Sequence, residues 1–281
     1  MVERMAQTTD RDRFALSPLR QAVLALLAVV AVVSPGCGTV PETGRRQLVM
    51  LSAAEESRLG EEAYAELLRD ARTVTSGPDF ERVQRVGARI AAAAERRYPE
   101  ATAGFDWRFA TIDVPEVNAW MLPGGKSGVN VGLLRLASTD DELAIVMGHE
   151  AAHAIARHGA ERISRSMAAA VVFGVASASG EVSPALVEAT AVAYGALGET
   201  AFSRGEETEA DHIGLLIAAE AGYDPRAALA FWRKMAEASD GAMPEFLSTH
   251  PSDERRAARL EALMPQAEAV ARAARARETA R

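Results

Sequence analysis

Two histidines and a glutamate near the middle of the chain have the types and spacing of a hydrolytic metal site. His149 and His153 are four residues apart, and Glu150 follows the first of them. On a helix, residues four apart lie about 40° from each other around the axis, so both imidazoles can reach one Zn²⁺ ion. Glu150, on the flank of that face, can accept a proton from the ion's water and pass it to a leaving amine. Such spacing also arises by chance or in purely structural histidine pairs. A metal site is therefore predicted only if the chain offers a third ligand.

The residues before this motif predict the helix that carries it. Thr139 and the acidic residues 140–142 are typical of a helix start, since a Thr side chain caps free N–H groups and carboxylates favour the first turn. The apolar run 143–147 is typical of a helix buried in a core. We expect the helix to end at His158 and Gly159, with His158 in a structural role near the terminal carbonyls.

The third metal ligand must come from another part of the chain. His158 is nine residues after His149 and would lie about 180° away on a continuous helix. A second helix is predicted to begin at Ser203, because an acidic turn follows this capping residue. Glu207 and Asp211 share one face of it, so one carboxylate can bind the ion while the other accepts the free N–H of a ligating imidazole. Alone, such an acidic stretch is typical of a solvated helix face.

The pairing of His-Glu-Ala-Ala-His with Ser-Arg-Gly-Glu-Glu-Thr-Glu-Ala-Asp at 203–211 resembles the M48 (Ste24/HtpX/Oma1-like) family of zinc metallopeptidases. The similarity extends from about residue 41 to about residue 263 and is greatest to the bacterial periplasmic and outer-membrane lipoprotein branch. It implies a mostly helical α+β, gluzincin-like domain with a small edge-exposed sheet over the metal-binding helix. The site it implies is one Zn²⁺ per chain on His149, His153 and Glu207, with Asp211 behind a ligand and Glu150 as general base and acid.

A second segment that fits the resemblance is an extended stretch after the turn Pro123-Gly124-Gly125. In the family this strand lies at the sheet edge, where unpaired backbone groups can hold an extended peptide. The substrate-binding strand is therefore expected at Gly128, Val129, Asn130 and Val131. The alternative is a plain structural hairpin.

The stretch 248–256, with His250-Pro251 at its centre, resembles a third segment of the family. The resemblance brings His250 and Arg256 to the metal site. Either can steady the oxyanion of a tetrahedral intermediate. Alternatively, a neutral His250 can occupy the open zinc position and hold the enzyme inactive, and a third interpretation is an ordinary exposed loop before a helix.

The N-terminus predicts export and a lipid anchor. Arginines precede the apolar run 22–33, which is short for a membrane span and typical of an export signal. Cys37 is the single cysteine and follows a small residue, which resembles a bacterial lipoprotein cleavage site. Acyl chains at Cys37 would anchor the protein in the cell envelope facing the periplasm, and Gly38 favours the outer membrane. An uncleaved inner-membrane signal anchor is the alternative, because Ser34 and Pro35 depart from the usual pattern.

Composition is consistent with one acidic globular domain. The 281 residues carry a net charge of −8, which argues against nucleic acid as a partner. We divide the chain into a signal peptide (1–36), a tether (37–50), a metallopeptidase domain (51–265) and a helical or frayed tail (266–281). A short apolar run at 167–176 predicts a helical hairpin beside the cleft rather than a membrane span.

Together these observations predict a zinc metalloendopeptidase of the cell envelope. The resemblance implies misfolded or damaged envelope polypeptides as substrates, and outer-membrane assembly machinery as a possible partner. The alternative function is an outer-membrane assembly factor or chaperone whose protease activity is latent or secondary.

Overall fold

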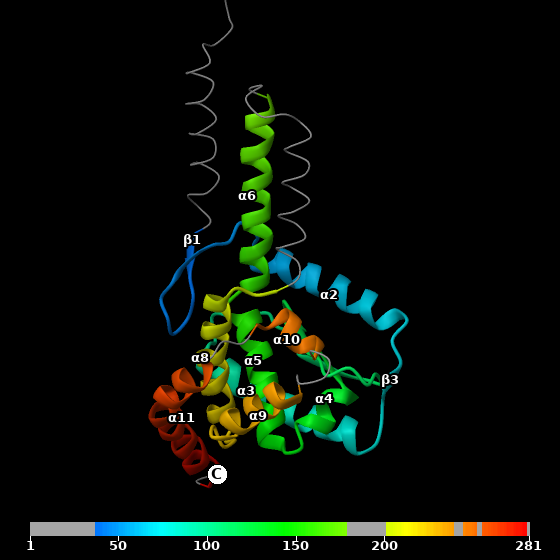
Figure 1. Ribbon diagram of the computed structural model, residues 1–281, viewed down its shortest axis with the longest axis vertical. Coiled ribbons are helices and arrows are strands. Elements are labelled where there is room, and N and C mark those ends of the chain that lie inside the picture. Colours follow the sequence, from blue (N-terminus) through cyan, green and yellow to red (C-terminus); the bar gives the residue numbers. More distant parts are fainter. Residues whose placement is uncertain (1–36, 179–200, 239–243, 252–254, 280–281) are drawn as a thin grey trace, which may run out of the picture.

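The computed structural model describes residues 37–178, 201–238, 244–251 and 255–279 (Figure 1). The described part is mostly helical with two small sheets, which confirms the predicted fold class. Its helices are α2 (Ala53–Arg69), α3 (Pro78–Arg97), α4 (Val131–Leu136), α5 (Asp140–Ile155), α6 (His158–Ala178), α8 (Arg204–Glu220), α9 (Ala227–Glu237), α10 (Glu245–Thr249) and α11 (Arg256–Thr279). Its strands are β1 (Cys37–Thr39), β2 (Arg46–Leu48), β3 (Thr73–Val74), β4 (Arg108–Ile112), β5 (Ala119–Leu122) and β6 (Lys126–Asn130).

Helix α5 forms the centre of the body and begins where the sequence predicts. The Thr139 hydroxyl accepts from the Glu142 backbone N–H, and the Glu142 carboxylate accepts from the Thr139 N–H. This reciprocal capping box satisfies two otherwise unpaired donors of the first turn. From Glu142 to Ile155 every residue of α5 is buried, so the helix is held on all sides by packing. Ser203 caps α8 through the same arrangement with Glu206, as predicted.

Helices α5 and α8 approach each other unusually closely because both have a glycine at the contact. A Cβ on Gly148 would lie 2.7 Å from the carbonyl oxygen of Gly214. A Cβ on Gly214 would lie 2.7 Å from both the nitrogen and the Cα of His149. These are backbone atoms, which cannot move aside without displacing the helix. The absence of two side chains therefore sets the distance between the helix of the His-Glu-Ala-Ala-His motif and the helix of Glu207.

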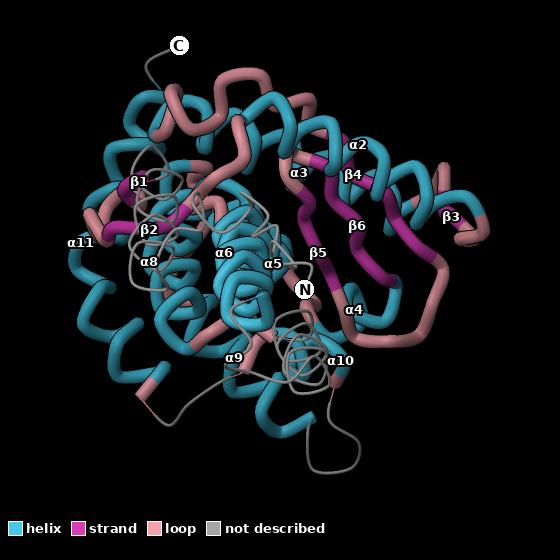
Figure 2. Tube along the Cα trace, turned by 90° about the horizontal axis from the view of Figure 1, so that it is seen from above, coloured by secondary structure: helices cyan, strands magenta, loops and turns pink. Residues whose placement is uncertain are grey.

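The larger sheet lies over α5 in the order β3-β4-β6-β5, which corrects one prediction (Figure 2). Strand β6 pairs with β4 on one side and with β5 on the other, so Gly128, Val129 and Asn130 are central and buried rather than at the edge. Val131 is not in the strand, because it begins α4. The prediction failed because a hairpin motif does not reveal which of its strands inserts beside a third one. The strands at the edges are β3 and β5, and β5 is the edge next to β6.

The two faces of the sheet are covered by different helices. Ala119 and Met121 of β5 are buried in the core that includes α5. Trp120, which points to the opposite face, packs edge-on against Tyr64 of α2 at 6.0 Å between ring centroids. Alternation along a strand sends neighbouring side chains to opposite faces, so the sheet is sandwiched between α2 on one side and α5 on the other.

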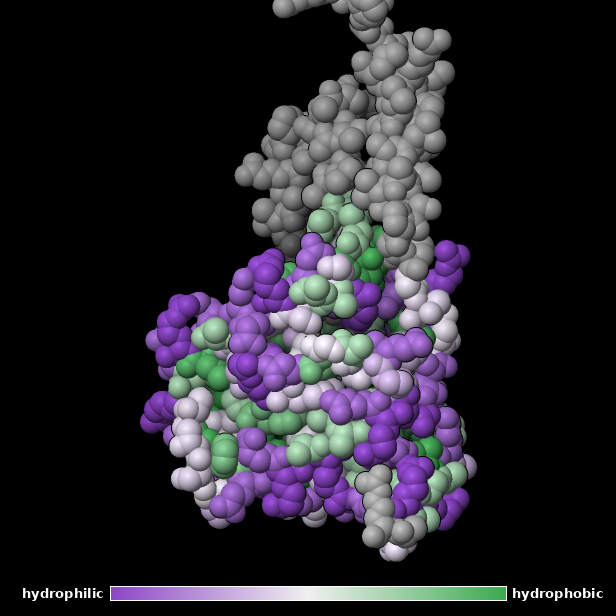
Figure 3. All heavy atoms as spheres, turned by 180° about the vertical axis from the view of Figure 1, so that it is seen from behind, coloured by the Kyte–Doolittle hydropathy of each residue, from purple (hydrophilic) through white to green (hydrophobic). Residues whose placement is uncertain are grey.

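The end of α5 differs from the expected one. The helix ends at Ile155, and Arg157 takes a positive φ of 58° that turns the chain. His158 is then the first residue of α6, not the last of α5, and it is fully buried. Because a non-glycine residue makes the turn, the glycine-based end signal was misleading. Helix α6 leads away from the body (Figure 1), and Ile163 and Met167 in its first half are exposed. Hydrophobic surface is visible where the body adjoins this part of the molecule (Figure 3).

The segment 37–50, expected to be a tether, instead forms the antiparallel hairpin β1–β2 packed on the body. Val40 is buried in the main core, and the Met50 N–H donates to the Ser164 hydroxyl of α6 at 2.8 Å. Residues 266–279 continue α11, with Ala267, Ala271 and Ala274 buried. Within the described ranges no helix is long and apolar enough to cross a membrane. The predicted signal peptide (1–36) and the second half of the hairpin after α6 lie outside the described residues.

Replacing Gly214 by alanine tests the close contact between α5 and α8. The added Cβ would force the two helices apart, so we expect the free energy of unfolding to fall by about 1–3 kcal/mol and metal affinity to fall with it. Denaturant unfolding of the purified protein measures the first quantity, and titration with metal measures the second. Gly205→Ala, in the same helix but with only the Ser203 hydroxyl within 4 Å, is the control. Equal stability of the two variants would contradict the interpretation.

Candidate metal centre

Four side chains from three segments converge below the sheet. His149 and His153 come from α5, Glu207 comes from the first turns of α8, and His250 directly follows α10. One candidate ligand atom from each lies within 4.8 Å of all the others, and all four residues are buried. The structure thus brings together the three residues that the resemblance implies as ligands, and it places His250 beside them.

The distances between these atoms fit a tetrahedral ion. Ligand atoms about 2.0–2.1 Å from a tetrahedral Zn²⁺ lie about 3.3 Å from one another. The two Nε2 atoms of His149 and His153 are 3.2 Å apart. Glu207 oxygens lie 3.4 Å from the first and 3.3 Å from the second. Glu207 Oε2 has no hydrogen-bond partner among the described residues. Close, buried nitrogen and oxygen atoms without enough donors between them are what a cation site requires.

Burial and charge act on the ionisable groups of this cluster in opposite directions. Burial lowers the pKa of His149, but the nearby Glu207 and Asp211 carboxylates outweigh it and raise that pKa to about 9. Burial also lowers the pKa of His153, and this effect outweighs the hydrogen bond to Glu207, which raises it. Burial raises the pKa of Glu207, but the surrounding histidines hold it well below its usual range. The cluster therefore keeps a carboxylate anion surrounded by imidazoles, which suits a divalent ion.

Asp211 and Arg256 lie behind the ligands rather than among them. Asp211 Oδ1 is 3.1 Å from His149 Nδ1, so it holds the proton there and leaves Nε2 free for a metal. Arg256 donates to the same Asp211 oxygen at 2.6 Å, and its guanidinium lies 3.3 Å from the centre of the Trp232 ring. Asp211 therefore lies where its predicted role, accepting the free N–H of a ligating imidazole, requires it to be. The guanidinium of Arg256 lies beside the Asp211 and Glu207 carboxylates, which it can hold in place. Its expected role at an oxyanion stays a prediction.

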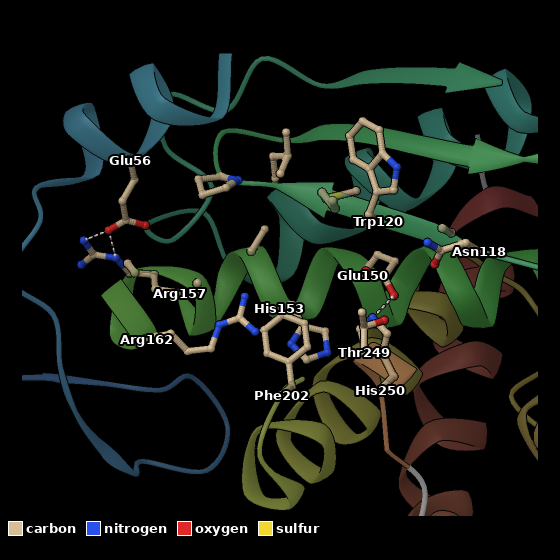
Figure 4. A pocket seen from close by; sticks show the side chains of 17 residues that line it. Glu56, Asn118, Trp120, Glu150, His153, Arg157, Arg162, Phe202, Thr249 and His250 are labelled. Atoms are coloured by element: carbon tan, nitrogen blue, oxygen red, sulfur yellow. Dashed lines mark hydrogen bonds and ion pairs between the residues drawn. The ribbon is translucent and has the colours of Figure 1, made fainter. Parts of the chain in front are cut away.

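His250 reaches both the candidate metal ligands and Glu150. Its Nδ1 lies 3.3 Å from His149 Nε2 and 3.0 Å from a Glu207 oxygen. Its Nε2 lies 3.6 Å from Glu150 Oε1 (Figure 4). Glu150 is buried, and burial raises the pKa of its carboxyl, which makes it a stronger base. The contacts of Nδ1 suit a fourth ligand and those of Nε2 suit a group beside the reacting atoms, so both roles expected for His250 stay predictions.

His158 and Glu209 make contacts beside the site that the sequence did not predict. His158 Nδ1 is 2.9 Å from His153 Nδ1, and His158 Nε2 is 3.2 Å from a Glu209 oxygen. His158 is not among the four ligand residues, so its structural role holds, but in a different form. Helical periodicity could not find these contacts, because the chain turns at Arg157 and Glu209 faces away from Glu207 on its helix. The signal in the sequence was the presence of a third histidine so close to the pair.

A cavity of about 230 Å³ opens next to this cluster. It is lined on one side by Glu150, His153 and His250, and on the other by residues 118–123, which include β5 (Figure 4). Asn118 lines it as well, and its buried Oδ1 has no hydrogen-bond partner among the described residues. The free edge of the sheet, not its centre, therefore faces the catalytic glutamate.

Comparison with known proteins identifies the family of this chain. The profile of peptidase family M48 matches residues 78–264, well over half of the sequence. The chain belongs to peptidase family M48. It is thus a metallopeptidase of that family, which confirms the enzyme class predicted from the two motifs.

Two groups of relatives in this family differ in their names. The chain is 36% identical over 235 residues to the mitochondrial metalloendopeptidase OMA1 of Schizosaccharomyces pombe, covering 82% of this chain and 67% of that protein. It is 42% identical over 153 residues to the protein of the same name in Arabidopsis thaliana, covering 54% of this chain and 30% of that protein. The beta-barrel assembly-enhancing protease of Escherichia coli is 27% identical over 248 residues, covering 84% of this chain and 49% of that protein. The chain therefore spans about half or less of the length of the last two.

Substituting Glu207 and Asp211 one at a time shows which of these two α8 carboxylates binds the metal and which only orients a ligand. Glu207→Gln removes a candidate ligand, so we expect affinity for Zn²⁺ to fall by more than about 100-fold. Asp211→Asn leaves the ligand set intact but weakens the hold on the His149 proton, and we expect a loss of about 10- to 100-fold. Chelator competition measures both dissociation constants. The reverse order would mean that Asp211, not Glu207, binds the metal.

Proposed function

We propose that this protein is a zinc-dependent metalloendopeptidase of the bacterial cell envelope that cleaves misfolded or damaged proteins. The observation that carries the proposal is the position of Glu150. Its buried carboxylate borders both the His149–His153–Glu207 cluster and the cavity below β5. A base between a metal site and a peptide-binding edge is the minimum that hydrolysis of an extended chain requires.

Each residue of the site has a chemical task in this proposal. His149, His153 and Glu207 would hold a zinc ion, which would supply Lewis-acid chemistry at the scissile carbonyl and lower the pKa of a water molecule. Glu150 accepts the proton of that water and delivers it to the leaving amine. Burial raises the pKa of Glu150 and so supports both steps. The carboxylate becomes a stronger base toward the water, and the carboxylic acid that results keeps its proton until the amine leaves. Asp211 and Arg256 keep His149 in the tautomer that binds metal.

Strand β5 is the part of the molecule best placed to hold the substrate. Within the described residues it is the last strand of its sheet, and it lines the cavity that Glu150 also lines. Its unpaired backbone groups can bind an extended peptide as an added strand. Such binding depends on the backbone rather than on side chains, so it suits unfolded polypeptides of varied sequence. Folded proteins, which lack free extended segments, are expected to resist cleavage.

Location in the envelope is proposed from Cys37 and from one relative. Acylation of Cys37, the first residue of β1, would anchor the protein facing the periplasm, with the outer membrane favoured and an inner-membrane signal anchor as the alternative. The E. coli relative's name supports a link to outer-membrane assembly machinery. Radiolabelled palmitate incorporation, compared between the full chain and Cys37→Ser, tests the anchor.

A second candidate function is an assembly factor or chaperone with latent protease activity. The observation that favours it is His250, whose Nδ1 lies among the three ligand atoms. A fourth protein ligand would complete a tetrahedral site, and structural zinc sites have four protein ligands whereas catalytic ones keep a position for water. Movement of the segment after α10 would then be needed before hydrolysis.

Glu150→Gln tests the protease mechanism. The amide cannot take up a proton, so we expect cleavage of an unfolded protein such as casein to fall at least about 100-fold while bound zinc stays near one per chain. Cleavage is followed on gels, and metal by elemental analysis. Loss of zinc in this variant would show that Glu150 is a ligand. Full activity would mean that another residue is the base.

His250→Ala tests latency. If His250 completes the coordination sphere, removing it opens a position for water, and we expect casein cleavage to increase several-fold with zinc affinity reduced by about 10-fold. If His250 instead stabilises the transition state, the same variant loses activity at unchanged zinc content. The Glu150→Gln substitution combined with His250→Ala is the control, since any cleavage remaining there comes from a contaminant.

A further inference from the structure

The turn of the N-terminal hairpin is attached to the body at two separate points, one at each end of the turn. At one end of the turn, Glu42 accepts from Arg97 at 2.7 Å and from the Tyr98 hydroxyl at 3.0 Å. At the other end, Arg45 reaches between α6 and α8, where it meets Glu161 and Glu209. The hairpin therefore bridges helices that are far apart in sequence. Only the second of these attachments leads toward the metal site.

Arg45 uses both sides of its guanidinium. Its two terminal nitrogens donate to the two oxygens of Glu161 at 2.9 and 2.7 Å. Its Nε lies 2.9 Å from both oxygens of Glu209, and Thr43 donates to the same carboxylate at 2.8 Å. The position of the Glu209 carboxylate is thus set by the hairpin.

From Glu209 a line of hydrogen bonds leads inward to a metal ligand. Its Oε2 meets His158 Nε2 at 3.2 Å, and His158 Nδ1 meets His153 Nδ1 at 2.9 Å. If His153 binds the ion through Nε2, its Nδ1 carries the proton and donates it to His158 Nδ1. His158 must then carry its own proton on Nε2, and the partner for that N–H is Glu209. Each bond has one possible direction, so the carboxylate at the far end determines the tautomer at the metal.

We propose that Arg45 is a positioning residue for the metal ligand His153, acting through Glu209 and His158, so that docking of the N-terminal hairpin completes the metal centre. The proposal rests on the metal-dependent function proposed above. His149 and His153 are then oriented by two independent carboxylates, Asp211 from within the body and Glu209 from the hairpin side. The segment 37–50 is accordingly part of the site, although it lies outside the region that matches the family profile.

The chemistry of Arg45 is specific to its guanidinium. A bidentate contact with Glu161 aims the Nε at Glu209, and a lysine ammonium cannot address two carboxylates in this planar manner. Lysine at this position keeps the charge but loses the direction. We therefore expect Arg45→Lys to fall between the wild type and Arg45→Gln in every property below.

The test compares Arg45→Gln with Glu42→Gln in the full chain. Both variants remove one charge from the same hairpin turn and break ion-pair contacts with the body, but only Arg45 contacts Glu209. We expect Arg45→Gln to weaken Zn²⁺ binding by about 10-fold, at the lower end of the range for residues behind a ligand, and Glu42→Gln to leave it within about 2-fold. Chelator competition measures affinity. The visible absorption of the Co²⁺-substituted proteins reports ligand geometry, and should change only in Arg45→Gln.

Thermal unfolding of the metal-free proteins excludes a merely structural effect. Both variants are expected to unfold at similar temperatures without metal, so a difference in zinc affinity cannot come from a looser hairpin. Equal zinc affinities, or an unchanged Co²⁺ spectrum in Arg45→Gln, would overturn the proposal. If Arg45→Gln does not fold, Arg45→Lys is measured against Glu42→Gln by the same criteria. A wild-type protein that binds no Zn²⁺ at all would instead contradict the proposed function.

Combining Arg45→Gln with Glu209→Gln shows whether Arg45 acts through the carboxylate. If it does, adding the arginine substitution to Glu209→Gln changes zinc affinity by less than about 2-fold, because the line of hydrogen bonds is already broken. If the double variant instead loses zinc affinity by the product of the two single-variant losses, Arg45 affects the metal by another route, and the proposed connection is overturned.

Discussion

The structure depends on the contact between α5 and α8 at Gly148 and Gly214. Two helices with ordinary side chains at their contact lie about 8–10 Å apart, whereas here each glycine faces the backbone of the other helix. This proximity brings a carboxylate of α8 to within 3.3–3.4 Å of the Nε2 atoms of both histidines of α5. Neither helix alone offers more than part of a coordination sphere. The site is thus a property of the pair of helices, and the surrounding core holds that pair in register.

The polar groups around the cluster explain how such a site is tolerated inside the protein. Buried imidazoles and carboxylates are costly unless they are paired, and here each histidine of α5 has a partner behind it. Asp211 with Arg256 supports His149, whereas His158 with Glu209 and Arg45 supports His153. The two supports come from different layers of the molecule. One belongs to the helical core, and the other includes the hairpin β1–β2, which begins at the candidate lipid-attachment residue Cys37.

His250 lies where activity and its control conflict. A metallopeptidase needs a metal position that is open to water and substrate, but a position that is always open would allow unregulated cleavage of nearby proteins. Packing of His250 against Phe246, with stacked rings 4.3 Å apart, places its Nδ1 at the cluster and its Nε2 toward Glu150. One side chain thus touches the groups that would bind metal and the group that would move the proton. The short helix α10, five residues long, is the element that carries it.

The amino-acid sequence by itself determined the helices, their caps and the ligand types, since these depend on neighbours within one or two turns. Thr139 and Ser203 cap where expected. The spacing of His149 and His153 predicted two candidate ligands, whereas Glu207 as the third came from the resemblance to the family. Only the tertiary structure decided which strand is the edge, because insertion of β6 between β4 and β5 depends on pairing with a distant strand. It also decided the contacts of Arg256 and His158. A guanidinium or an imidazole takes its function from whichever partner lies nearest in space, and that partner is here 45 or 5 residues away along the chain. The hairpin at 37–50 follows the same principle, since its short strands are too weak to form alone and exist because the body offers charged groups and a core position for them.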